Sequence, residues 1–159
     1  MKKYLKFIAA ALALIGLFMM FGTQGTFKWS PFGTEEVLGI QALVGGTYKI
    51  GTKIESPVYS GLAGYILLGS AALVLLVVAL VPYFKEHDIL SVVVTGVAAI
   101  CLIIGIIFLF LIRKNFADGN GFESSKVYVG WAAIAAGSLG GLAISPTGLS
   151  MVLDLTGSN

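Results

Sequence analysis

Few residues in this chain have the types and spacing that catalysis, metal binding or redox chemistry requires. The one histidine, His87, lies in the run Lys85-Glu86-His87-Asp88. A zinc site needs about four ligands around one ion, and this short run cannot wrap around an ion, so we interpret it as a solvated turn. Cys101 is the one cysteine, which excludes a disulfide and a paired-cysteine redox centre. We interpret it as a small apolar packing residue.

Other catalytic and ligand-binding patterns are missing from the sequence. The segment Asp118-Gly119-Asn120-Gly121-Phe122-Glu123 lacks the length and ligand number of a calcium loop, and its glycines and asparagine indicate turns. No glycine-rich phosphate loop follows a strand, and no two carboxylates share one face of a helix. The sequence therefore predicts no catalytic residues, no cofactor, no metal site and no enzyme activity.

The composition indicates a protein of the membrane. Of 159 residues, 57% are hydrophobic and only 11% are charged, against about 25% charged in soluble domains. So few charges cannot solvate a globule this apolar, which excludes a soluble protein and a disordered chain. The net charge of +2 provides no basic patch, so we expect no nucleic-acid partner. The expected partner is the lipid bilayer.

The charges leave four uncharged runs, of 21, 29, 24 and 27 residues. About 20 apolar residues cross a bilayer as a helix, so each run is long enough for one crossing and none for two. Strand-like alternation is absent from the runs, which argues against a barrel. We predict an all-α fold of one domain, 1–159: an antiparallel bundle of four transmembrane helices. The expected positions are about 4–22, 58–82, 89–112 and 127–144.

Two segments allow alternatives. The first helix has the basic start and apolar stretch of a cleavable signal peptide, although Thr23-Gln24-Gly25 is a poor cleavage site. Beyond the fourth helix, Ser145-Pro146 either caps a short surface helix through 151–153 or marks a Pro-kinked continuation of the same helix.

The four uncharged runs leave no ionisable side chain in the expected helix interiors. Such groups mark ion paths and proton relays in membranes, so their absence argues against a proton-coupled transporter or a charge-lined channel. A pore lined by hydroxyl groups stays open as an alternative. Its candidate residues are Ser70, Ser91, Thr95 and Ser138.

The loop between the first two helices has a pattern of its own. Tyr48, Ile50, Thr52 and Ile54 alternate with polar residues and glycine, which predicts a strand. Gly45-Gly46 suits a tight turn after the apolar stretch 37–44. We therefore predict a β-hairpin over about 37–55, with its apolar face on the bundle or on a partner.

Two surfaces are candidates for contacts. In the fourth helix, Ala133, Gly137 and Gly141 recur every four residues, a spacing that favours close helix packing within the bundle or in an oligomer. In the first loop the candidate partner surface combines aromatic and apolar residues. They are Trp29, Phe32, Tyr48, Ile50 and Ile54.

The orientation signals conflict. With both termini inside, the cytoplasmic side carries four basic residues and the other side six. We nevertheless predict cytoplasmic termini in the cell membrane, because the first helix usually dominates orientation and its start is basic.

Three segments carry a resemblance to known proteins: Phe18-Met19-Met20-Phe21, the stretch 38–46 and the fourth helix. With them the chain resembles a broad group of small, uncharacterised four-helix (tetraspan) membrane proteins of bacteria, which implies no particular activity. The layout also resembles the claudin-like arrangement. Trp29 is present in the first loop, but the second tryptophan and the two cysteines of the claudin motif are not, so this resemblance concerns topology only.

The sequence thus favours a non-catalytic membrane protein of structural, accessory or interaction type, acting through helix packing and the outer loop. Its partner would be a second copy of the chain or another membrane protein. The alternative is a small oligomeric channel or transporter subunit.

Overall fold

The computed structural model describes residues 2–29, 33–38, 43, 46–47, 53–54, 58–120, 125 and 127–156. Its body consists of four long helices, prolonged at the end of the first by the 3-10 turn η1 (Met19–Phe21). All four are long and apolar enough to cross a membrane, which confirms the four predicted spans and indicates a multi-pass membrane protein. The helices are α1 (Lys2–Phe18), α3 (Tyr59–Leu80), α5 (Asp88–Phe110) and α7 (Trp131–Leu155).

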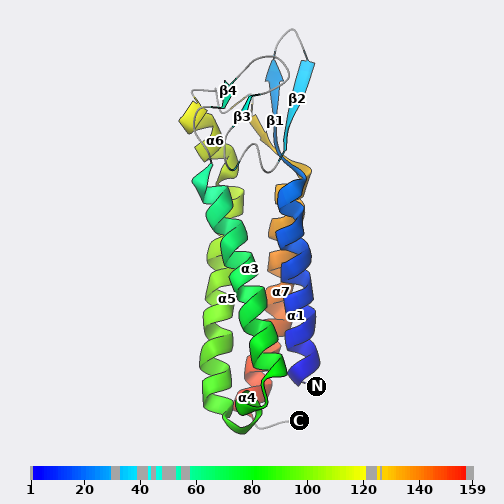
Figure 1. Ribbon diagram of the computed structural model, residues 1–159, viewed down its shortest axis with the longest axis vertical. Helices are drawn as coiled ribbons and strands as arrows, with labels where there is room; N and C mark the ends of the chain where they lie inside the picture. The colour runs from blue at the N-terminus through cyan, green and yellow to red at the C-terminus, as the bar shows by residue number, and fades with distance from the viewer. Residues whose placement is uncertain are drawn as a thin grey trace.

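The helices run alternately up and down in a ring (Figure 1). Each packs on two neighbours: α1 and α5 both contact α3 and α7. Both termini lie at one end, beside the short helix α4 (Tyr83–Glu86) that joins α3 to α5. The strands lie at the opposite end, which we call the outer end; the end that holds the termini is the terminal end.

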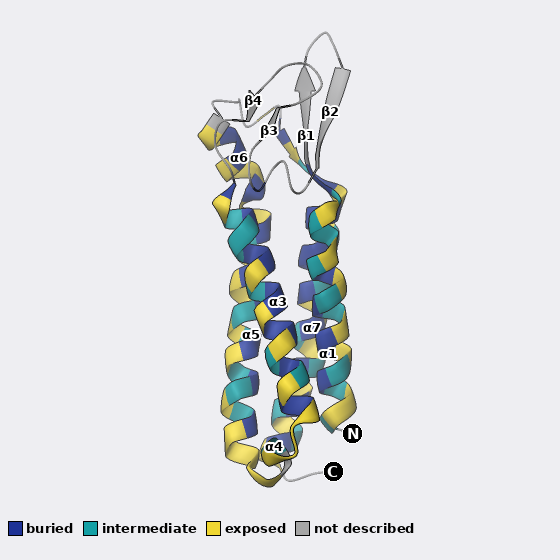
Figure 2. Cartoon of the chain, in the orientation of Figure 1, coloured by how far each residue is buried: buried dark blue, intermediate teal, exposed yellow. Residues whose placement is uncertain are grey.

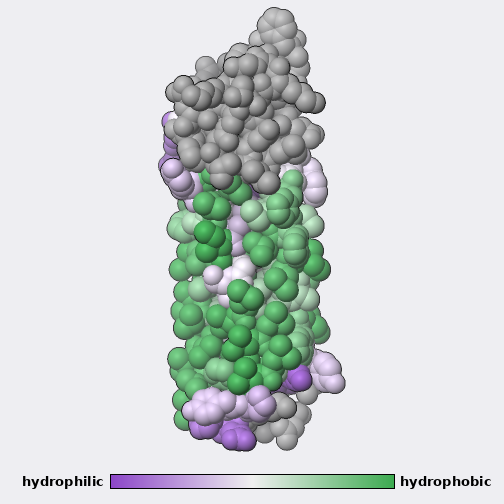
Figure 3. All heavy atoms as spheres, viewed as in Figure 1, coloured by the Kyte–Doolittle hydropathy of each residue, from purple (hydrophilic) through white to green (hydrophobic). Residues whose placement is uncertain are grey.

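Figure 2 shows buried residues along each helix, and the buried residues of the spans are mostly apolar, while Figure 3 shows that the visible outside is apolar as well. A green apolar band covers most of the visible helix surface around a pale patch, with polar residues at the terminal end. Such a surface matches hydrocarbon, because lipid tails are as apolar as the core. The largest apolar side chains that are fully buried within the spans are those of Tyr65, Leu68, Leu75, Leu102 and Leu109.

Two glycines let α3 and α5 approach closely. A Cβ atom added to Gly64 would lie 2.9 Å from the carbonyl oxygen of Gly105, and one added to Gly105 would lie 3.1 Å from that of Gly64. The two backbones therefore touch where no side chain stands between them, as is common for membrane helices.

The outer end carries a small layer of strands and one helix. Strand β1 (Thr23–Trp29) lies between β2 (Gly33–Leu38) and β5 (Val127–Val129), antiparallel to both. Helix α6 (Ile112–Asn120) extends from the end of α5. Residues from two distant loops thus form one sheet.

The hairpin predicted over 37–55 is not supported. Gly46, expected in its turn, lies in β3 (Gly46–Thr47) and pairs with Ile54 of β4 (Lys53–Ile54). Val37 and Leu38, expected in the first strand, belong instead to β2 and pair with β1. The alternating pattern of residues 48–54 favoured a hairpin closed by a turn at Gly45-Gly46. In the structure, the start of the predicted hairpin pairs with β1, which also pairs with the distant β5.

The fourth span also differs from the prediction. Residues 127–129 form β5, so α7 begins at Trp131, and it continues through Pro146 to Leu155 instead of ending near 144. The continuation is the second of the two alternatives for this segment. A proline removes one backbone donor. Close to Pro146, two hydroxyl groups donate to backbone carbonyl oxygens. The Thr147 hydroxyl donates to the carbonyl oxygen of Ala143 (2.7 Å), and the Ser150 hydroxyl donates to the carbonyl oxygen of Thr147 (2.8 Å).

Candidate functional site

A buried charge cluster lies at the terminal end of the bundle. The Lys6 ammonium donates to a carboxylate oxygen of Asp154 at 2.8 Å and to the hydroxyl oxygen of Ser91 at 2.7 Å. The Ser91 hydroxyl donates to the same Asp154 oxygen at 2.9 Å. Lys6 and Asp154 are each only 4% exposed and Ser91 is 1% exposed. The three residues come from α1, α5 and α7, so the cluster ties three helices together.

A second lysine extends the charge cluster toward the surface. Lys2, one turn before Lys6 on α1, lies 3.8 Å from the other carboxylate oxygen of Asp154 and 3.7 Å from a carboxylate oxygen of Asp88. The four charges balance as two cations and two anions. Asp88 is half exposed, so this part of the cluster reaches the water at the terminal end.

The helix positions explain why these side chains meet. Lys6 lies in the second turn of α1, Ser91 in the first turn of α5 and Asp154 in the last turn of α7. Because α1 and α5 begin at the end of the bundle where α7 finishes, all three turns share one level. On α7 the polar residues Thr147, Ser150 and Asp154 recur at spacings of three and four, which places them on one helix face.

Lys6, Ser91 and Asp154 form a closed set of hydrogen bonds in which each group contacts the other two. A serine is activated by a group that accepts its proton. The Lys6 amino group lies 2.8 Å from Asp154 and donates to Ser91, so it stands as a donor to the hydroxyl. The group that accepts from the Ser91 hydroxyl is the Asp154 carboxylate, which is also paired with the Lys6 ammonium.

The charge cluster is confined to the part of the bundle next to the terminal end. Among the residues that the structure describes, Lys6 and Asp154 are the only buried side chains that carry a charge at neutral pH. Above them come the buried hydroxyls of Thr95, Thr147 and Ser150, and then apolar residues. The Thr95 hydroxyl, fully buried one turn above Ser91, has no hydrogen-bond partner in the described part of the chain.

The expectation that no ionisable group lies inside the helices is therefore corrected. It came from taking the uncharged runs as the whole spans, whereas α1 begins at Lys2 and α7 continues to Leu155. The signal in the sequence was the stripe Thr147, Ser150 and Asp154, which has helical spacing once the helix is allowed to pass Pro146.

A second buried polar group fixes the outer layer to the bundle. The Tyr65 hydroxyl of α3 donates to the side-chain oxygen of Gln24 at 2.6 Å, and both residues are at most 1% exposed. The Gln24 side-chain nitrogen donates to the carbonyl oxygens of Met19 (2.9 Å) and Gly22 (3.2 Å). The Gly130 amide donates to the Gln24 carbonyl at 2.8 Å, which links β1 to the start of α7.

The three residues of the predicted packing face differ in burial. Ala133 is 1% exposed, and Gly137 lies against the ring of Phe110, which a Cβ atom on Gly137 would approach to 3.1 Å. Gly141 is exposed, and no described atom outside its immediate neighbourhood lies within 4 Å of its Cβ position. The four hydroxyl residues that were candidates for lining a pore also differ in burial: Ser91 and Thr95 are buried, while Ser70 and Ser138 are exposed.

The predicted partner surface is only partly described. Trp29 is the last residue of β1 and pairs through its backbone with Gly33. Ile54 pairs with Gly46. The remaining three residues, Phe32, Tyr48 and Ile50, lie outside the described residues.

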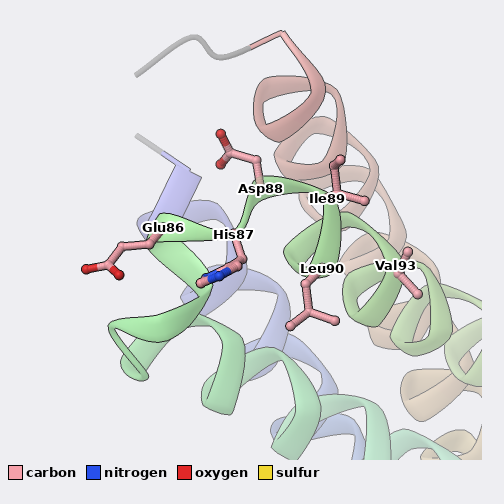
Figure 4. Close-up of a pocket in the computed structure, with 6 residues that line it drawn as sticks. All are labelled: Glu86, His87, Asp88, Ile89, Leu90 and Val93. Atoms are coloured by element: carbon pink, nitrogen blue, oxygen red, sulfur yellow. The ribbon is translucent and has the colours of Figure 1, made fainter.

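A hollow of about 550 Å³ lies at the terminal end around His87. It is lined by Glu86, His87, Asp88, Ile89, Leu90 and Val93. Figure 4 shows that the carboxylates of Glu86 and Asp88 point in different directions, with His87 between them. His87 stacks on Tyr83, with ring centres 4.2 Å apart. No group of three metal-ligating side chains occurs in the described part of the chain.

No protein family model, curated protein or solved structure matches this chain.

Proposed function

We propose that the protein is a non-catalytic, multi-pass protein of the cell membrane with cytoplasmic termini. Its role is structural or accessory, and it acts by contacts with a second copy or with another membrane protein. The observation that carries this proposal is the filled interior of the bundle. Tyr65, Leu68 and Leu102 are at most 1% exposed, and they occupy the space that a pore through one copy would need.

The outer layer supports the same proposal. It is held by buried hydrogen bonds from Gln24 to α3, η1 and the start of α7, so the strands have a defined position on the bundle. A surface with a fixed position loses less freedom on binding than a flexible one. The outer end is thus the proposed place of contact.

Photo-crosslinking tests this proposal. A photoreactive residue replaces Tyr128 of β5, which is 45% exposed at the outer end, or Tyr83 of α4, which is 54% exposed at the terminal end. We expect a discrete adduct, to a second copy or to one membrane protein, from position 128 and none from position 83. Adducts from neither position, or from position 83 alone, would contradict contact through the outer end.

The alternative is an oligomeric channel or transporter subunit, and one observation favours it. The Cβ positions of Gly141 and Gly148 on α7 meet no described atom within 4 Å, and α7 is the least apolar of the four spans. A pore between copies would need such a face. Ion flux into liposomes that contain the purified protein, measured beside its mass in native-like lipid, separates the two functions: flux from an oligomer supports the channel, and no flux supports the accessory role.

A further inference from the structure

The first helix packs into the bundle along one face. Ala9, Ala10 and Ala13 are fully buried, and the side chain of Leu17 packs against Gly69 of α3. A signal peptide that is cleaved makes no lasting contacts with the mature protein. These contacts favour a retained helix but do not by themselves require one, because apolar surface can also face lipid.

The charge cluster gives a stronger reason. Both cations that face Asp154, Lys2 and Lys6, belong to α1. Without α1, the side chain facing Asp154 in the cluster would be Ser91, a neutral hydroxyl. The other charged residue of the cluster, Asp88, is an anion as well and would add repulsion.

We propose that α1 is a permanent helix of the mature protein and that its Lys6 is the counter-ion that α7 requires to stay across the membrane. A carboxylate in an apolar site is costly unless it is paired and hydrogen-bonded. α7 is also the least apolar span and contains Pro146, so it has the least hydrophobic drive to offset that cost. The insertion of the last helix thus depends on the first.

The topology supplies a direct measurement. α5 ends at the outer end and α7 returns to the terminal end, so residue 155 lies on the side of the termini only when α7 crosses the membrane. The test uses the full chain with Cys101→Ser and Leu155→Cys, because Leu155 is 69% exposed. A membrane-impermeant maleimide then reports on which side residue 155 lies.

The variants are Lys6→Met, Lys6→Met with Asp154→Asn, and Lys3→Met as the matched control. Lys3 is an exposed lysine of the same helix and carries the same topogenic charge. We expect Lys6→Met to give a several-fold rise in labelling from the outer side. The double variant should return to the pattern of the parent protein, and Lys3→Met should not differ from it.

The intact mass of the purified protein is the second readout, and we expect it to include α1. A mature protein that lacks α1 would overturn the proposal. So would Lys6→Met labelling that equals that of Lys3→Met, or a double variant no better than Lys6→Met. If Lys6→Met merely fails to accumulate, recovery by the double variant still supports the pairing, and failure of both overturns it.

Discussion

At the scale of single residues, a few buried polar groups connect elements that are distant in the sequence. Gln24 makes four hydrogen bonds with its side chain and carbonyl, and its partners lie in α3, at η1 and just before α7. A buried polar atom that loses its partner costs more than the hydrogen bond contributed, because it has also lost water. Gln24 therefore contributes to the attachment of the outer layer to the bundle.

Tyr65→Phe tests that contribution. The variant leaves the Gln24 side-chain oxygen buried without the 2.6 Å hydrogen bond, so we expect the free energy of unfolding to fall by about 1–3 kcal/mol. Thermal unfolding in mild detergent measures the change. Tyr59→Phe on the same helix, at a side chain 70% exposed, is the control and should have little effect. Equal stability of the two variants would contradict the anchoring role of Gln24.

Thr95→Val tests the opposite situation. The Thr95 hydroxyl is buried without a partner, so its replacement by a methyl group of the same shape should leave stability unchanged or raise it by up to about 1 kcal/mol. Thr147→Val is the matched variant on α7, because it loses the 2.7 Å bond to Ala143. It should lower stability by about 1 kcal/mol. The prediction fails if Thr95→Val is the more damaging of the two in the same unfolding measurement.

At the scale of elements, α7 has two different small faces one turn apart. Gly137 faces the interior against Phe110, while Gly141 faces outward with open space around it. Close packing of helices needs small residues only where a neighbour is present. The two glycines should therefore respond differently to the same substitution.

Gly137→Leu and Gly141→Leu form that comparison. The first places a large side chain against the Phe110 ring and should cost about 1–3 kcal/mol of stability. The second should change the stability of a single copy by about 0.5 kcal/mol or less, as exposed substitutions do. Size measurement in native-like lipid adds the assembly readout: a smaller particle for Gly141→Leu alone would make the outward face an oligomer contact. Equal destabilisation would contradict the assignment of the two faces.

At the scale of the whole molecule, different polar interactions join the elements at the two ends of the bundle. The terminal end is joined by charges from α1, α5 and α7, and the outer end by the neutral hydrogen bonds of Gln24. The band between them has a largely apolar visible outside (Figure 3), and most of its buried residues are apolar. From this arrangement we expect the bundle to cross a bilayer with its two ends on opposite sides.

Cysteine labelling tests the topology. In a Cys101→Ser background, Glu86→Cys at the terminal end and Asp118→Cys on α6 should react with an impermeant maleimide from opposite sides. Both positions are exposed, so accessibility does not limit either reaction. The cytoplasmic placement of the termini predicts that position 86 reacts only after the cell membrane is opened. Labelling of both positions in intact cells would contradict four crossings.

The sequence by itself determined the number of spans and their approximate centres. Uncharged runs of 21 to 29 residues are a local property, and the part of each run that lies in hydrocarbon must be helical whatever its neighbours do. The sequence also determined that Ala133 and Gly137 belong to a small-residue stripe, although not which members of that stripe face inward.

Only the tertiary structure decided where α7 ends and how the outer strands pair. Asp154 reads as a polar boundary in the sequence, yet Lys6, 148 positions away, supplies its counter-charge inside the bundle. β1 takes β5, about a hundred residues distant, as one of its two neighbours, so a local turn at Gly45-Gly46 could not set the register. In both cases the free energy of a buried polar group depends on its partner, and a partner from another helix or loop leaves no trace in the local pattern.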